Sequence, residues 1–86
     1  MEAGDYTIKY SYHYAGHEID TNEIGFCDIY SKLGSIDSAK YKHVIIKESQ
    51  SVSFDFSLKE NCTDFEVRVY SYQKGLVLDS VEIVKH

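Results

Sequence analysis

The sequence predicts a small all-β protein, an antiparallel β-sandwich of about six strands in a single domain, residues 1–86. Two observations favour this class: six segments are rich in strand-forming apolar residues, mostly alternating with polar ones, and short turn-forming segments separate them. A third is the absence of proline, which suits long strands because proline lacks the N–H that a sheet ladder needs. No segment has a convincing amphipathic helical period, so the strands are expected to pair with antiparallel neighbours.

Two strands and one ambiguous segment are expected in the first half of the chain. Asp5–Tyr14 alternates tyrosine and isoleucine with polar residues, which predicts a strand, and the polar segment Ala15–Glu23 predicts a loop. Ile24–Leu33 has apolar residues on both faces of a strand, so it fits either a strand or a short helix. A turn at Gly34–Ser38 then leads to a strand at Tyr41–Glu48.

Three strands are expected in the second half. Ser51–Leu58 has the most regular alternation in the chain, with Val, Phe, Phe and Leu on one face and Ser, Ser, Asp and Ser on the other. Asp64–Tyr72 alternates in the same way, and Leu76–Val84 follows a turn at Gln73–Gly75. We therefore expect the last two strands to form a hairpin, with Gly75 in a left-handed conformation.

The last strand breaks its own alternation. Leu76 and Leu78 have one parity, whereas Val81 and Ile83 have the other. A β-bulge at Asp79-Ser80 adds one residue and returns all four apolar side chains to one face. In the expected hairpin, Ser71 then lies opposite Leu76, Val69 opposite Leu78, Val67 opposite Val81 and Phe65 opposite Ile83.

Composition excludes some classes of function. The net charge is −5, with 14 acidic and 9 basic residues, and the basic residues are scattered. This argues against nucleic-acid binding, which needs a clustered positive surface, and is compatible with a neutral polar ligand or a protein partner. No apolar run is long enough to cross a bilayer, and the N-terminus lacks the features of a signal peptide. The sequence does not decide the cellular compartment: the chain is either cytoplasmic, which is slightly favoured, or a piece of a larger protein.

The two cysteines, Cys27 and Cys62, permit one disulfide without requiring it. Folds of this size that depend on disulfides contain more cysteine, so two reduced thiols are favoured. Asn61-Cys62-Thr63 matches the N-glycosylation pattern, but its short polar neighbours favour a turn between two strands.

The second half of the chain resembles a known family. Its Phe65-x-Val67-x-Val69 strand, Gly75 and the Leu78-Asp79-Ser80-Val81-x-Ile83 ending are similar to the closing strands of galactose-binding-like jelly-roll carbohydrate-binding modules. Ser51 to Phe56 resembles an inner strand of that family. Such β-sandwiches are ancillary domains of bacterial glycan-handling enzymes, but they are usually longer, so the resemblance implies a truncated jelly roll here.

Tyrosines are the candidate binding residues. Glycan recognition uses flat aromatic rings against sugar rings, with a few polar side chains to fix orientation. Arg68, Tyr70 and Tyr72 share the outward face of one strand, and Tyr10, Tyr12 and Tyr14 form a stripe on another. If the two strands are neighbours, they form one tyrosine-lined surface. The alternative for the Tyr10 stripe, which we favour, is a place in the core.

Metal and enzyme hypotheses are weaker. His13, His17 and His43 lack zinc-ligand spacing, and a structural calcium on Asp20, Asn22 and Glu23 has no spaced acidic loop to support it. No nucleophile or phosphate-loop motif is present, so no catalytic residues are assigned.

The expected function is therefore a non-catalytic module that binds a glycan beside a catalytic protein domain, with no cofactor. The alternative is a structural or oligomerisation module whose tyrosine face packs on another domain or on a second copy of itself.

Overall fold

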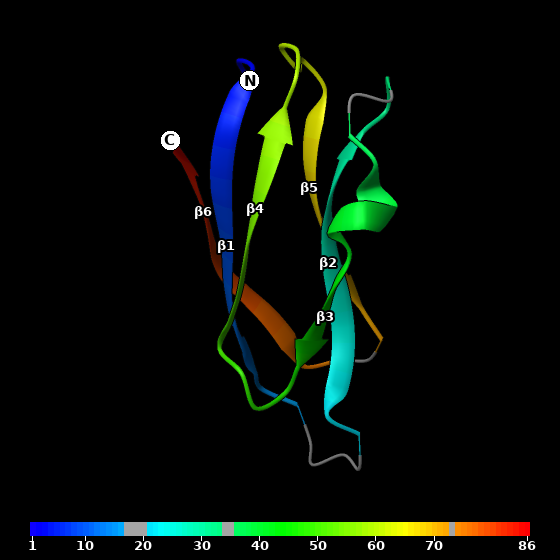
Figure 1. The fold of residues 1–86 in the computed structure, drawn as a ribbon. Helices are drawn as coiled ribbons and strands as arrows, with labels where there is room; N and C mark the ends of the chain where they lie inside the picture. Colours follow the sequence, from blue (N-terminus) through cyan, green and yellow to red (C-terminus); the bar gives the residue numbers. More distant parts are fainter. Residues whose placement is uncertain (17–20, 34–35, 73) are drawn as a thin grey trace.

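The computed structural model describes residues 1–16, 21–33, 36–72 and 74–86. Six strands form two three-stranded antiparallel sheets that pack face to face, which confirms the expected all-β sandwich (Figure 1). The elements are β1 Gly4–Tyr14, β2 Glu23–Ser31, a 3₁₀ helix η1 Ser38–Tyr41, β3 His43–Ile46, β4 Ser51–Leu58, β5 Phe65–Ser71 and β6 Leu76–Lys85.

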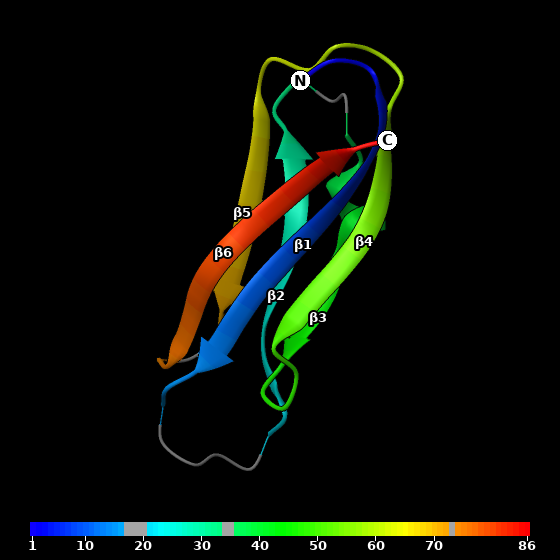
Figure 2. The same cartoon turned by 90° about the vertical axis from the view of Figure 1, so that its left-hand side faces the viewer.

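The strand order is β4-β1-β6 in one sheet and β3-β2-β5 in the other. Figure 2 views the first sheet from its outer side, with β1 between β4 and β6. The expected hairpin of the last two strands is therefore wrong. β5 pairs with β2, and β6 crosses to the other sheet to pair with β1. Gly75 does have a positive φ of 115°, but it serves a connection between sheets instead of a hairpin turn.

The bulge in the last strand is confirmed, although its partner differs from the expected one. Ser11 lies opposite Ser80 and Tyr12 lies opposite Leu78, so Asp79 is the extra residue on β6. Because opposing residues share a face, the bulge places Leu76, Leu78, Val81 and Ile83 on the inner side. The parity conflict in the sequence thus located a real irregularity.

The core contains the tyrosine stripe of β1. Tyr10 is 0% exposed and Tyr12 is 2% exposed, in contact with the apolar side chains of both sheets. Their hydroxyls reach across the sandwich: Tyr10 donates to the carbonyl of Asp28 at 2.7 Å, and Tyr12 donates to that of Ile46 at 3.1 Å. Burial raises the pKa of both phenols. A core tyrosine is acceptable here because the opposite sheet satisfies its hydroxyl.

The ambiguous segment is a strand, since Glu23–Ser31 forms β2 in the centre of its sheet. The strand expected at Tyr41–Glu48 is shorter, because Ser38–Tyr41 forms η1 and only His43–Ile46 pairs with β2. The part of the chain that the structure describes contains no helix long and apolar enough to cross a membrane.

Both cysteines are free and buried, as the sequence favoured. Cys62 lies in the turn between β4 and β5, where Asn61 accepts a hydrogen bond from the Ala3 amide at 2.9 Å. Asp64 closes the same turn, because its carboxylate accepts hydrogen bonds from the Ser31 hydroxyl and the Leu33 amide, each at 2.8 Å.

Candidate functional site

The outer faces of the two sheets differ in chemistry. The outer face of the β4-β1-β6 sheet is mostly polar, with Lys9 between Ser53 on one neighbouring strand and Glu82 on the other, and among the described residues it carries no aromatic ring cluster. Val77 and Val84 on β6 are its exposed apolar members. The outer face of the β3-β2-β5 sheet carries rings, and we call it the aromatic face. Its ring-bearing members are Phe26, Tyr30, Tyr70 and Tyr72. The aromatic face is thus the outer surface suited to a ligand with flat apolar faces.

Strand register explains why these rings share one side. Phe26 on β2 lies opposite Tyr70 on β5, and the next pair, Cys27 and Val69, points the other way into the core. Cys27 is fully buried, and its pKa is raised to about 12 by burial and then by the nearby Asp28 carboxylate. The alternation along β5 therefore turns Tyr70 away from the core, and Tyr72, two residues later, has the same parity.

An ion pair with a buried carboxylate anchors the middle of the aromatic face. Arg68 donates from Nε and Nη2 to the two carboxylate oxygens of Asp28 at 2.8 and 2.7 Å. The Asp28 side chain is 6% exposed, and that of Arg68 is 44% exposed. The Arg68 guanidinium also lies 4.3 Å from the ring centroid of Tyr30. The Asp28 carboxylate raises the pKa of Arg68, so this guanidinium is a fixed, permanently charged donor.

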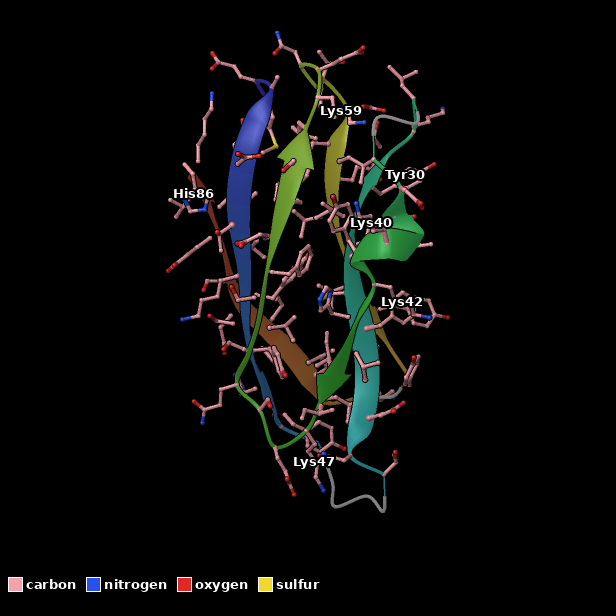
Figure 3. All side chains as sticks on the ribbon, in the orientation of Figure 1. Tyr30, Lys40, Lys42, Lys47, Lys59 and His86 are labelled. Carbon is pink, nitrogen blue, oxygen red and sulfur yellow. The ribbon has the colours of Figure 1, made fainter. Side chains whose placement is uncertain are left out.

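The rings beside this pair form a packed group. Phe26 and Tyr70 stack with centroids 5.1 Å apart and planes 14° from parallel. Lys42 Nζ lies 4.3 Å from the Phe26 centroid, and Figure 3 shows Lys42 and Tyr30 on the side of their sheet that faces away from β1. Tyr72 meets Phe26 and Tyr70 at 52° and 62°. The group holds Tyr70 in place while leaving 59% of it exposed.

A hollow of about 450 Å³ lies along β5 at this group. It is lined by Phe26, Val67, Arg68, Val69 and Tyr70. Its volume is in the range of small-ligand sites, and its lining combines aromatic, aliphatic and guanidinium groups.

The structure keeps only part of the expected site together. Arg68, Tyr70 and Tyr72 lie on the aromatic face, with Tyr72 51% exposed. Tyr12 is a core residue, so its assignment as a ligand-binding residue is wrong. Tyr14 is half-buried on β1, and β1 and β5 belong to different sheets. The single surface that was to join the two tyrosine sets therefore does not form.

Three site residues were missed from the sequence: Phe26, Asp28 and Tyr30. All three come from the segment whose strand or helix character was open, and without a strand assignment their shared outward parity could not be used. A signal was present, since an aspartate among apolar residues in a central strand needs a charged partner on an adjacent strand.

A second hollow, of about 500 Å³, lies between η1 and the end of β4. It is larger, but its charged groups are of both signs and its one ring, Tyr41, is half-buried with Phe54 stacked at 5.9 Å. It is lined by Ile36, Asp37, Lys40, Tyr41, Ser57, Lys59 and Glu60. The hollow at β5 is the better candidate because it adjoins the exposed rings.

The expected metal candidates have other roles where they are described. His13 Nδ1 lies 2.9 Å from an Asp79 carboxylate oxygen at the bulge, and the His43 ring stacks on Phe54 at 4.3 Å. Asn22 accepts a hydrogen bond from the Glu48 amide at 3.3 Å. His17 and Asp20 lie outside the described residues. Within the described ranges, no three His, Cys, Asp or Glu side chains group as metal ligands would.

Comparison with known proteins assigns neither a family nor a function to the chain. No protein family profile matches the chain, and no curated protein or solved structure is significantly similar to it. Functional inference therefore rests on the aromatic face itself.

Proposed function

We propose that the chain is a non-catalytic carbohydrate-binding module whose aromatic face binds a glycan. The observation that carries this proposal is the exposure of Tyr70 and Tyr72 beside Arg68, whose guanidinium is fixed by a buried carboxylate. Exposed rings next to a fixed polar donor are what recognition of a sugar requires, because the apolar face of the sugar covers a ring and its hydroxyls need oriented partners.

The mechanism is stacking with polar orientation. Phe26 has Tyr70 on one side and the Lys42 ammonium near its ring, so its contribution is to hold Tyr70 in position. Tyr70 and Tyr72 offer the exposed ring surface. Arg68 uses two of its five N–H groups on Asp28, which leaves three to donate to sugar hydroxyls in the hollow.

Charge on the aromatic face favours a neutral ligand. The Arg68 charge is neutralised by Asp28, and the remaining Lys42 ammonium and Glu66 carboxylate are of opposite sign. An uncharged glycan meets no net repulsion there, which fits the stacking mechanism.

A glycan array with Tyr72→Ala and Tyr70→Ala variants tests the proposal. We expect the wild-type protein to bind a defined set of glycans and each variant to lose about tenfold or more in affinity, because an aromatic contact is worth roughly 1 kcal/mol beyond its buried area. Val84→Ala is the matched control, since Val84 is similarly exposed on the other sheet. Absence of binding above background for the wild type would reject the proposal.

A second candidate is a docking face for another protein domain. Val44 lies opposite Phe26 on β3 and is 43% exposed, so apolar surface extends across the sheet. If no glycan binds and Tyr70 and Tyr72 are protected from solvent in a complex with a neighbouring domain, this candidate replaces the first.

A further inference from the structure

β5 is an edge strand with an unpaired side. In the described part of the chain, β5 pairs with β2 and no strand lies beyond it in the sheet. β6 is the edge strand of the other sheet, and Figure 1 shows both edges on the far side of the sandwich, away from β3 and β4. An unpaired edge of this length is a template for another strand.

Backbone parity identifies the groups on that edge. The Tyr72 amide donates to the Ile24 carbonyl at 2.9 Å, so residues of the same parity on β5 direct their main chain toward β2. Val67 and Val69 have the opposite parity, and their N–H and C=O groups therefore point out of the sheet edge. Their side chains face the core and are half-buried.

The same side of the sandwich leaves apolar side chains uncovered. Leu78 and Ile83 lie opposite the buried Tyr12 and Ile8 and so belong to the inner face of β6. They are nevertheless 42% and 39% exposed. The core is thus open where β5 and β6 form the edges, and another body at this side would lower that exposure.

We propose that a second copy of the chain covers this side, with the two β5 strands paired antiparallel about a two-fold axis at Val67. The β3-β2-β5 sheets of the two copies then join into one six-stranded sheet. Val67 lies opposite the partner's Val67, and Phe65 lies opposite the partner's Val69, so the inner positions are apolar on both sides.

Charge complementarity favours this register over those centred on the neighbouring residues. With the axis at Val67, Glu66 lies opposite the partner's Arg68, and symmetry gives the same ion pair a second time. An axis at Glu66 places two glutamates opposite each other, and an axis at Arg68 places two arginines opposite each other. Opposite charges stabilise a cross-strand pair and like charges destabilise it, so Val67 is the favoured centre.

The dimer and the candidate glycan site share the β5 edge, because Val67, Arg68 and Val69 line the hollow and also face the partner strand. In the dimer, the outward rings of Tyr70 and Tyr72 are therefore the part of the site that stays open to a glycan. Tyr70 and Tyr72 point outward from the joined sheet, so two aromatic faces lie on one continuous surface. Two linked sites raise the avidity for a repetitive ligand without any new contact.

Analytical ultracentrifugation and disulfide trapping test the proposal. We expect the wild type to dimerise, and Glu66→Lys to raise the dissociation constant of the dimer by roughly tenfold because two attractive pairs become repulsive. Glu82→Lys, the same charge change on β6, is the matched control. Val67→Cys should form a disulfide-linked dimer under mild oxidation, because opposed residues at an antiparallel pair lie within disulfide reach. Ser53→Cys on the remote edge strand β4 should not.

A wild-type chain that stays monomeric at high concentration overturns the proposal. So does a dimer that survives Glu66→Lys and fails to cross-link at Val67→Cys, since it must use another surface. The two native cysteines are buried and do not compete for the cross-link.

Discussion

Arg68 on β5 and Asp28 on β2 are joined by two parallel hydrogen bonds, 2.8 and 2.7 Å long, on the outer surface of a central strand. The carboxylate is nearly inaccessible to solvent, so the pair is partly desolvated and needs both members. It links the edge strand that carries Tyr70 to the centre of the sheet, and it fixes the donor of the proposed binding site.

Removing the guanidinium is expected to destabilise the fold. Arg68→Ala leaves the Asp28 carboxylate buried without its partner. Removing one partner of a buried pair leaves an uncompensated charge, so we expect a lower free energy of unfolding. The loss should be smaller than for a fully buried pair, because the Arg68 side chain is 44% exposed. Urea denaturation measures the change. The stability of Arg68→Lys should lie between that of the wild type and that of Arg68→Ala, because lysine restores the charge but not the bidentate geometry. An unchanged urea midpoint in Arg68→Ala contradicts this interpretation.

Gly25 allows β5 to approach β2 closely next to the aromatic face. A Cβ atom at this position would clash with the Tyr70 carbonyl oxygen. We expect Gly25→Ala to cost about 1–3 kcal/mol and to weaken glycan binding, because β5 must shift and carries Tyr70 with it. Ser53→Ala, at an exposed position on β4, is the control. Wild-type stability together with wild-type glycan affinity in Gly25→Ala would show that the contact is relieved without moving the site.

Stability should decline in acid partly through Asp64. Hydrogen bonds from the Leu33 amide, then the Ser31 hydroxyl, hold its pKa below the ordinary value of 3.8. Because the folded pKa is the lower one, this stabilisation is present above the unfolded pKa and is lost as pH falls through the folded pKa. Urea midpoints at about pH 6 and about pH 3 should therefore differ less in Asp64→Asn than in the wild type. Equal differences in the two proteins would remove Asp64 as a contributor.

The thiols should be inert in the folded protein. Cys27 is fully buried with its pKa raised to about 12, and Cys62 is also buried, with its Sγ 3.4 Å from an Asp64 carboxylate oxygen. A thiol-specific reagent at neutral pH is expected to react with neither cysteine until urea is added, and then with both. Rapid labelling without denaturant would mean that the sandwich opens at one of these positions.

The alternation of apolar and polar residues predicted which side chains share a face of a strand better than it predicted which strands pair. Ser51–Leu58 was located to the residue, and the conflict between Leu78 and Val81 located the bulge at Asp79. The partner of β6 was wrong because alternation states which side chains share a face and says nothing about which strand lies alongside. Gly75 fits a connection between sheets as well as it fits a hairpin.

The residues that alternate with the tyrosines explain why those of β1 are buried and Tyr70 on β5 is exposed. The other face of β1 carries polar residues such as Lys9 and Ser11, so the tyrosine face of this strand had to be the buried one. The other face of β5 carries Val67 and Val69, so on this strand the valines face the core and Tyr70 is exposed. The sequence indicated that Asp28 needs a charged partner, but Arg68 could not be identified as that partner because the pairing depends on strand order and not on local pattern.

The most direct test of the proposed function is an ¹H–¹⁵N NMR titration of the wild-type protein with a glycan identified by the array. We expect saturable shifts centred on the amides of Phe26, Arg68, Tyr70 and Tyr72, and we expect these shifts to be lost in Tyr72→Ala. Shifts confined to Lys40, Tyr41 and their neighbours beside η1 would contradict it, because the ligand would then occupy the other hollow.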